Sequence, residues 1–393
     1  MTKLEKDFLT VIKNGLHGTE ESITSEVDDL EQLALTHICV PFVYRGALNA
    51  GVAVSEKWKN FMTVSFFRNQ KNLQIQSIVL ESLKNAGIPC AIIKGSTVSV
   101  NYPEPMLRTL GDIDILVKPE DYEKAIGILC GNDRKTEFVK EHKFHYEYAF
   151  QGVSIEIHKY VTEYTSPEYG NIIEESMSSA LDELQIKQID EFEFPSLNNK
   201  FMAATLLLHK QRHFFENRLP IRMLCDWTMF IKNVDIHEWN EVVYPFVEKI
   251  GLAYFCDAIT EVCNKYLGAD CGNKVRHTTK NETIENIILE FLNDGVIKND
   301  KSISQNIASG YSQNATKSEG KIVPFFMILN NIARNEFSLA RKSKLFLPLF
   351  WIYIPIRYLF RVLTGKRSKI SFKTFNETTR RKSDIINELK LKD

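Results

Sequence analysis

Two acidic residues on one predicted strand are the first feature with chemical meaning. Side chains alternate along the stretch from Leu110 to Val117, which places Asp112 and Asp114 on one face and the apolar residues on the other. Neighbouring carboxylates repel each other and lose hydration on burial, so a folded chain tolerates them mainly where a cation neutralises them. The pair is therefore either a cation site or a solvated strand end that carries two acids by chance.

A third carboxylate lies on a later predicted strand. Residues 136–161 alternate, and on the return strand of the predicted hairpin Glu156 and His158 share a face, with His145 expected nearby on the paired strand. Two such strands in one small sheet bring three carboxylates together, which chance explains less easily than either strand alone. For both histidines the pattern favours a structural or orienting role over direct catalysis.

A turn upstream of these acids is suited to phosphate. An apolar run ends at Lys94-Gly95-Ser96, where glycine allows close backbone approach and the N–H groups of a helix start can face an anion. Taken alone, this turn is better explained as an ordinary strand-to-helix connection, and the downstream acids favour the phosphate site. Lys94 and Arg108 either neutralise phosphate charge or form salt bridges with an acid of the cluster.

The elements that position these residues form a compact α/β unit in a mostly helical chain. The expected fold class is α/β (α+β), with a small mixed sheet. Helical periodicity predicts a helix from about residue 69 to residue 85 before the first strand, and further helices from about residue 196. The predicted parts are an N-terminal helical region (1–88), the α/β core (89–165), a helical domain over the cleft (166–295), a polar linker (296–322) and a C-terminal helical, basic region (323–393).

As a set, the motifs resemble the nucleotidyltransferases of the DNA polymerase β superfamily, and more closely a bacterial family of uncharacterised nucleotidyltransferases. They are Ile93-Lys94-Gly95, Arg108, Asp112-Ile113-Asp114-Ile115-Leu116-Val117 and Glu156-Ile157-His158. One departure is that fifteen residues separate Ser96 from Asp112, more than is usual in the superfamily.

The resemblance implies a metal-dependent transfer of a nucleoside monophosphate from an NTP to an unidentified acceptor, with release of pyrophosphate (an EC 2.7.7-like activity). It implies that Asp112, Asp114 and Glu156 are the catalytic acids and hold Mg²⁺ or Mn²⁺, hard cations that prefer carboxylate oxygens. It also implies that Lys94, Gly95, Ser96 and Arg108 bind the nucleotide. The alternatives are an inactive nucleotide-binding relative and a membrane-surface scaffold in polysaccharide biosynthesis.

The helical stretch after the core adds three further cleft candidates. His209 and His213 are four residues apart on one helix face, and Asp226 lies on the next predicted helix. The His pair lacks the Glu of a His-Glu-x-x-His zinc motif, which favours packing over the cleft rather than zinc binding.

Composition excludes several classes of protein. With a net charge of −1 and no basic–aromatic patch near the motifs, the chain is not expected to bind nucleic acid. Seven scattered cysteines without Cys-x-x-Cys, and an N-terminus without an apolar run, predict a cytoplasmic protein rather than a secreted one.

The C-terminal region contains the second unusual stretch. Residues 345–356 are twelve uncharged residues, followed by Arg357 and Arg361. This run is shorter than the ~20 residues of a membrane span. It predicts a helix buried on the core, a peripheral membrane contact through residues 345–367, or an oligomer contact.

Overall fold

The computed structural model describes residues 1–131, 139–141, 145–161, 167–216, 218–293, 323–337, 339–340, 343–364 and 372–391. The polar linker predicted at 296–322 lies outside these residues. The chain forms two compact units, residues 1–212 with 220–280, and residues 213–219 with 281–391. Each unit is described by itself.

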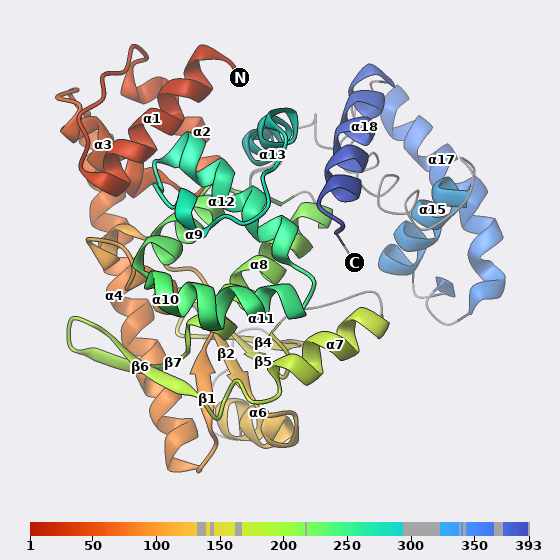
Figure 1. Cartoon of the computed structure of the whole chain (residues 1–393). Helices are drawn as coiled ribbons and strands as arrows, with labels where there is room; N and C mark the ends of the chain where they lie inside the picture. Colours follow the sequence, from red (N-terminus) through yellow and green to blue (C-terminus); the bar gives the residue numbers. More distant parts are fainter. Residues whose placement is uncertain are drawn as a thin grey trace. The chain divides into compact units, whose positions relative to one another are not determined.

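A seven-stranded mixed sheet forms the lower part of the first unit in Figure 1, with strand order β3-β4-β5-β2-β1-β7-β6. Strand β2 runs parallel to β5 and antiparallel to β1, and β1 runs parallel to β7. This sheet confirms the expected α/β core. The strands are β1 (Cys90–Ile92), β2 (Ile113–Val117), β3 (Val139–Glu141), β4 (His145–Phe150), β5 (Val153–His158), β6 (Leu184–Ile189) and β7 (Phe192–Leu197).

Two helices cover one face of this sheet. Apolar side chains of α4 (Glu56–Asn85) and α6 (Tyr122–Cys130) form one hydrophobic core with Ile113, Ile115 and Ile157. Burial of these side chains fixes the orientation of β2 and β5, because a slip of one residue would turn every side chain to the opposite face. The alternate positions of the same strands therefore face away from α4 and α6.

Helix α4 begins thirteen residues earlier than the sequence predicts, at Glu56 rather than near Asn69. Between Lys59 and Arg68 no side chain is buried, so this part of the helix carries no apolar periodicity to detect. Its start is held by Trp58, which is fully buried and donates its indole N–H to Asp28.

The hairpin β6–β7 lies in the stretch 166–295, where the sequence predicts helices. Strand β7 adds to the sheet beside β1, with Ile92 opposite Ser196. Strand β6 is half exposed, so its sequence shows no clear alternation. Strand β7 contains Pro195, and proline in a sequence argues against a core strand.

The rest of the first unit is helical, as expected. Helices α1 and α3 approach so closely that a Cβ on Gly46 would lie 1.8 Å from the Val11 carbonyl oxygen, which explains glycine there. The elements are α1 (Lys3–His17), η1 (Val27–Leu30), α2 (Glu31–Thr36), α3 (Val40–Asn49), α5 (Ser96–Ser99), η2 (Pro105–Leu107), η3 (Pro119–Asp121), α7 (Pro167–Met177), α8 (Asn199–Glu216, whose last residues belong to the second unit), α9 (Arg222–Asn233), α10 (Ile236–Glu238), η4 (Trp239–Val243), α11 (Tyr244–Lys249), α12 (Ala253–Leu267) and η5 (Gly272–Lys274).

The described part of the second unit is helical. Arg381 and Lys382 form ion pairs with the buried Glu290, which join α18 to α13. Helices α15 and α17 pack through a separate small hydrophobic cluster. The elements are α13 (Asn281–Asn293), α15 (Val323–Glu336), η6 (Lys344–Phe346), α17 (Leu347–Leu363) and α18 (Phe372–Glu388).

Candidate active site

Neighbouring parallel strands bring the three predicted carboxylates together. In the register of β2 and β5, Asp114 lies opposite Glu156 and Leu116 lies opposite His158. Asp112 directly precedes β2. One oxygen from each of Asp112, Asp114 and Glu156 lies within 4.8 Å of the others. These three residues are called the carboxylate cluster below.

Two basic side chains lie against these carboxylates. The Nζ atom of Lys94 lies 2.6 Å from Oδ1 of Asp114, and Nε2 of His158 lies 3.0 Å from the same oxygen and 3.1 Å from Oε2 of Glu156. Burial raises the pKa of Asp114, but Lys94 and His158 lower it more, so the net pKa lies well below the usual range. Burial lowers the pKa of His158, but its hydrogen bonds to the two carboxylates raise it more, so the net pKa is higher than usual.

The pKa of Asp112 is shifted in the opposite direction from that of Asp114. The charge of Asp114, together with partial burial and the charge of Glu156, raises the pKa of Asp112 to about 6. Its side chain is exposed to solvent, unlike that of Asp114. Three convergent carboxylates with one repelled acid at the solvent side fit a divalent cation, because hard cations take oxygen ligands and neutralise the repulsion.

We expect binding of Mg²⁺ or Mn²⁺ to weaken as the pH falls below about 6, because a metal ion must then displace the proton on Asp112. One displaced proton predicts an affinity about tenfold lower for each pH unit below the pKa. Calorimetric titration with Mn²⁺ between about pH 5 and pH 8 measures this slope, and buffers of different ionisation enthalpy count the released proton. An affinity that stays constant over this range would exclude Asp112 as a ligand.

The glycine turn lies beside the carboxylate cluster. Gly95 adopts φ +62°, which favours glycine, and a Cβ there would lie 3.6 Å from the carbonyl oxygen of Asp112. The hydroxyl of Ser96 is buried and donates to Oε1 of Gln76 at 2.6 Å. The Ser96 side chain is thus hydrogen-bonded within the protein, and the phosphate contact predicted for this turn would use its backbone.

Three buried amide side chains of α4, which sequence reasoning missed, hold the loops of the site. The Nδ2 group of Asn69 donates to the carbonyls of Met106 and Arg108, and its Oδ1 accepts from the N–H of Leu110. Asn72 donates to the carbonyl of Gly111 at 2.7 Å. Together with Gln76 these residues recur at i, i+3 and i+7, a spacing that places them on one helix face. That polar row inside an apolar helix face was the available signal.

Replacing Asn69 with Ala should lower the free energy of unfolding by about 2–4 kcal/mol, because it leaves buried backbone groups before Asp112 without partners. It should also lower kcat more than it raises KM, since the loop that carries Asp112 loses its anchor. Urea unfolding and steady-state turnover measure the two effects. The matched control is Asn60→Ala, an exposed position on the same helix. If Asn69→Ala matched Asn60→Ala in both free energy of unfolding and turnover, the anchoring role would be wrong.

Arg108 and Asp226 meet in the interior, next to the site loop. Nε and Nη2 of Arg108 donate to the two oxygens of Asp226 at 2.7 and 2.8 Å, and the Tyr102 hydroxyl donates to Oδ1 at 2.7 Å. Arg222 donates to the carbonyl of Thr109 at 2.8 Å. The sequence predicts that Arg108 binds nucleotide or pairs with an acid of the cluster, and that Asp226 lies near the cleft. The structure pairs Arg108 with Asp226, an acid outside the carboxylate cluster. The nucleotide contact of Arg108 and the cleft position of Asp226 stay predictions.

Among the other histidine candidates, His145 lies beside the carboxylate cluster. Its Nε2 lies 3.9 Å from Oε2 of Glu156, and its ring centroid lies 5.1 Å from that of His158. His145, Glu156 and His158 form a second three-ligand group, and no such group in the described chain includes His209 or His213 on α8.

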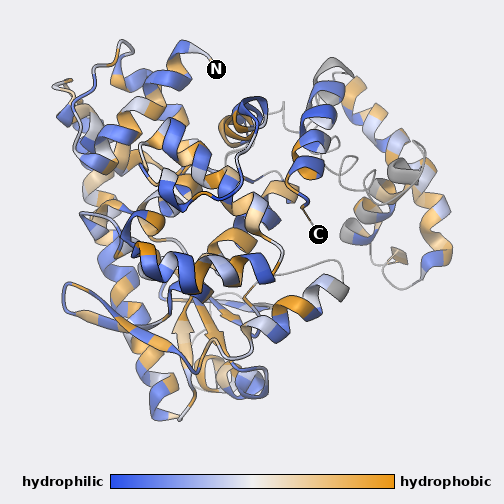
Figure 2. Cartoon of the chain, in the orientation of Figure 1, coloured by the Kyte–Doolittle hydropathy of each residue, from blue (hydrophilic) through white to orange (hydrophobic). Residues whose placement is uncertain are grey.

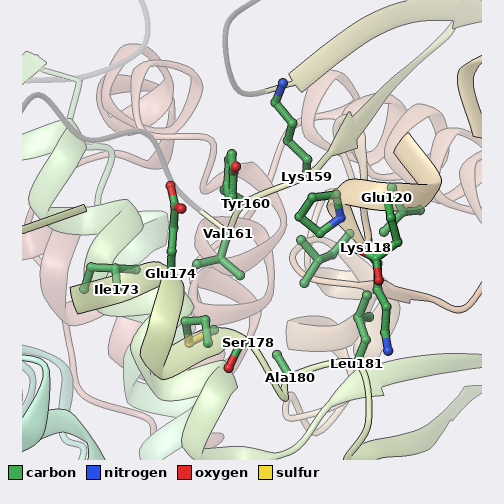
Figure 3. A pocket seen from close by; sticks show the side chains of 14 residues that line it. Lys118, Glu120, Lys159, Tyr160, Val161, Ile173, Glu174, Ser178, Ala180 and Leu181 are labelled. Carbon is green, nitrogen blue, oxygen red and sulfur yellow. The ribbon is translucent and has the colours of Figure 1, made fainter. Parts of the chain in front are cut away.

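A cavity of about 340 Å³ lies at the carboxyl ends of β2 and β5 (Figure 3). Its lining includes Leu116, which lies two residues beyond Asp114 on β2 and shares its face, and Lys159, which directly follows His158. Lys118 and Glu174 lie on opposite sides of the hollow, so its wall carries both signs of charge.

Comparison with known proteins agrees with this geometry. A family model described as "Uncharacterised nucleotidyltransferase" matches residues 24–268, more than half of the chain. The match covers the carboxylate cluster, the glycine turn and the helices from α2 to α12. A search among curated proteins finds no match.

Proposed function

The chain belongs to this family of uncharacterised nucleotidyltransferases, and we propose that it moves a nucleoside monophosphate from an NTP to an acceptor hydroxyl or amine, releasing pyrophosphate. The observation that carries the proposal is the convergence of three carboxylates within 4.8 Å on one face of the sheet. A divalent ion, Mg²⁺ or Mn²⁺, would be held by Asp112, Asp114 and Glu156 and would neutralise the transferring phosphate.

The reacting atoms define the remaining roles. The acceptor oxygen or nitrogen attacks the α-phosphorus, the bond to pyrophosphate breaks, and the acceptor proton passes to Glu156. Burial raises the pKa of Glu156, but its hydrogen bond to His158 and other contacts lower it below the usual value, so Glu156 is ionised and ready to accept a hydrogen bond. His158 orients Glu156 and Asp114 together, which fixes the attack direction.

Positive charge and backbone complete the nucleotide site. Lys94 lies against Asp114 and supplies a cation beside the phosphates, and the backbone of Gly95 and Ser96 cradles them. Arg108 has a positioning role, because two of its donors are hydrogen-bonded to Asp226.

In this proposal the acceptor occupies the cavity at the carboxyl ends of β2 and β5. A volume of about 340 Å³ is in the range of small-molecule sites. The wall carries both signs of charge. It therefore favours a polar acceptor substrate, one with both hydrogen-bond donor and hydrogen-bond acceptor groups, over a purely apolar substrate.

The test is incubation of the protein with each NTP, labelled in turn at the α- and the γ-phosphate, together with Mg²⁺ or Mn²⁺ and cell extract. The α-label should enter a product and the γ-label should leave as pyrophosphate. Transfer of the γ-label would indicate a kinase. NTP binding without turnover across all extracts would support the inactive relative and overturn the proposal.

A further inference from the structure

Helix α17 has one face packed and one face bare. Leu347 and Ile354 are buried against α15, Phe350 stacks on Phe337 at 4.6 Å between ring centroids, and the Trp351 indole N–H donates to Asn330. The sequence predicts, as one possibility, a helix buried on the core. In the structure this face of α17 packs on the small hydrophobic cluster that it shares with α15. The opposite face is exposed, and Tyr353 at its edge contacts the rings of Phe337 and Phe350.

The bare face is apolar along the whole helix. Its residues recur at intervals of three and four, and each is between 48% and 77% exposed. Figure 2 shows the hydrophobic colouring along α17. Soluble proteins seldom expose a continuous set of this kind without a partner. The apolar stripe consists of Leu349, Ile352, Tyr353, Ile356, Leu359, Phe360 and Leu363.

Charge in the sequence on either side of the stripe has a single sign. Residues 341–373 contain nine Lys or Arg and no Asp or Glu, in a chain whose net charge is −1. Arg357 lies beside the stripe, over the rings of Phe337 and Tyr353. An apolar helix face flanked by cations is complementary to a membrane surface that carries anionic lipid.

We propose that α17 lies in the surface of an anionic membrane, with the apolar stripe in the acyl boundary and the basic residues among the headgroups. Within the described chain, Lys344–Leu363 is the one helix long and apolar enough to cross a membrane by length and composition. A crossing would carry Arg357 and Arg361 into the hydrocarbon and would have to accommodate the packed helix α15, whereas an in-plane helix avoids both costs.

A second copy of the chain is the competing occupant, because intervals of three and four also occur in coiled coils. In a coiled coil, charged residues of opposite sign flank the apolar residues that meet between the helices. Here aromatic residues, Tyr353 and Phe360, occupy such flanking positions at the edge of the stripe. A second copy would also bring two segments of nine cations together without an acid between them. Repulsion therefore disfavours the dimer and favours the anionic surface.

The test uses the full chain and sedimented vesicles of two compositions, phosphatidylcholine alone and phosphatidylcholine with about one-third phosphatidylserine. The chain should sediment with the anionic vesicles and bind them at least about tenfold more weakly in about 0.5 M salt. The double variant Ile352→Gln, Ile356→Gln should reduce binding at least about tenfold. The control Ile186→Gln changes an isoleucine of similar exposure, 67%, in the other unit and should bind as the parent does.

Each outcome decides the proposal. Absence of binding by the unaltered chain to anionic vesicles overturns it, as does a double variant that binds them as well as the control. A dimer in sedimentation velocity that the double variant converts to monomer, without vesicle binding, identifies a second copy as the occupant. The substituted side chains are exposed, so a circular dichroism melt should show unchanged folding. This inference does not depend on the proposed transfer reaction.

Discussion

Asn in place of Asp112 should abolish nucleotidyl transfer and raise the stability of the metal-free protein. Turnover should fall at least ~10³-fold, about 4 kcal/mol of transition-state stabilisation, because one ligand of the metal is lost. The ionised Asp112 is repelled by Asp114 and Glu156, and its pKa of about 6 lies above the ordinary 3.8. Its charge therefore opposes folding at neutral pH, and the uncharged amide removes that repulsion.

The pH dependence gives the sign of this effect. The raised pKa means that the folded protein binds the Asp112 proton more tightly than the unfolded chain. The gain in thermal midpoint from Asp112→Asn should be largest above about pH 6 and should shrink towards about pH 4, where Asp112 is protonated in the folded protein. Thermal melts in a chelator across this range measure the trend.

Asp114→Asn should abolish turnover to a similar degree but lower stability. Asp114 is 2% exposed and accepts from both Lys94 and His158. Removing its charge leaves the largely buried ammonium of Lys94, whose side chain is 16% exposed, without its closest partner, at a cost of about 3 kcal/mol. Its lowered pKa means that this stabilisation is present at neutral pH and is lost as acid protonates the carboxyl.

Glu56→Gln, at an exposed residue that pairs with Lys59 at the start of α4, is the control and should change neither property. Asp112→Asn should stabilise the protein and Asp114→Asn should destabilise it, while both lose turnover. This combination would distinguish a metal site from a purely structural cluster. If Asp112→Asn destabilised the protein as Asp114→Asn does, or if either variant kept turnover within about tenfold of the parent, the proposed site would be wrong.

Sequence reasoning finds the carboxylate cluster because strand geometry is local. Alternation along Asp112-Ile113-Asp114 and Ile155-Glu156-Ile157 sets which side chains face the core. Burial of the isoleucines against α4 and α6 then leaves the acids on the other face. The pairing of β2 with β5 aligns Asp114 and Glu156 without further information from the loops.

Contacts between distant segments are not accessible in this way. Ser96 and Gln76 meet because α4 crosses behind the glycine turn, and only the path of the folded helix decides this. The same crossing brings Asn69 to the loop before Asp112. In sequence these amides interrupt an apolar helix face, and nothing local tells which backbone groups they bind.

The pairing of Arg108 with Asp226 shows the same limit and leads to a further prediction. The two residues are 118 positions apart, and both side chains are at most 8% exposed. An arginine shortly before an Asp-x-Asp strand resembles a phosphate ligand in sequence, and its position after folding depends on where α9 packs. Burial raises the pKa of Asp226, but Arg108, Arg222 and Tyr102 together lower it more, so the pair is ionised at neutral pH.

Asp226→Asn should lower the free energy of unfolding by about 3–5 kcal/mol, because it leaves the guanidinium buried without an anion. The double variant Arg108→Met, Asp226→Leu should recover much of this loss, since it removes both buried charges. The exposed pair of Arg45 and Glu104 is the control, and Glu104→Gln should cost less than about 1 kcal/mol. Urea unfolding of the parent protein and these three variants measures the free-energy differences.

Kinetics of Arg108→Lys separate the positioning role from phosphate binding. Lysine cannot reproduce the two parallel hydrogen bonds to Asp226, so the loop before Asp112 should shift and kcat should fall by about 10–100-fold. KM for the NTP should stay within about threefold, because the donors lost are those that Asp226 accepts. A KM raised at least about tenfold with stability unchanged would instead place the guanidinium of Arg108 on the triphosphate.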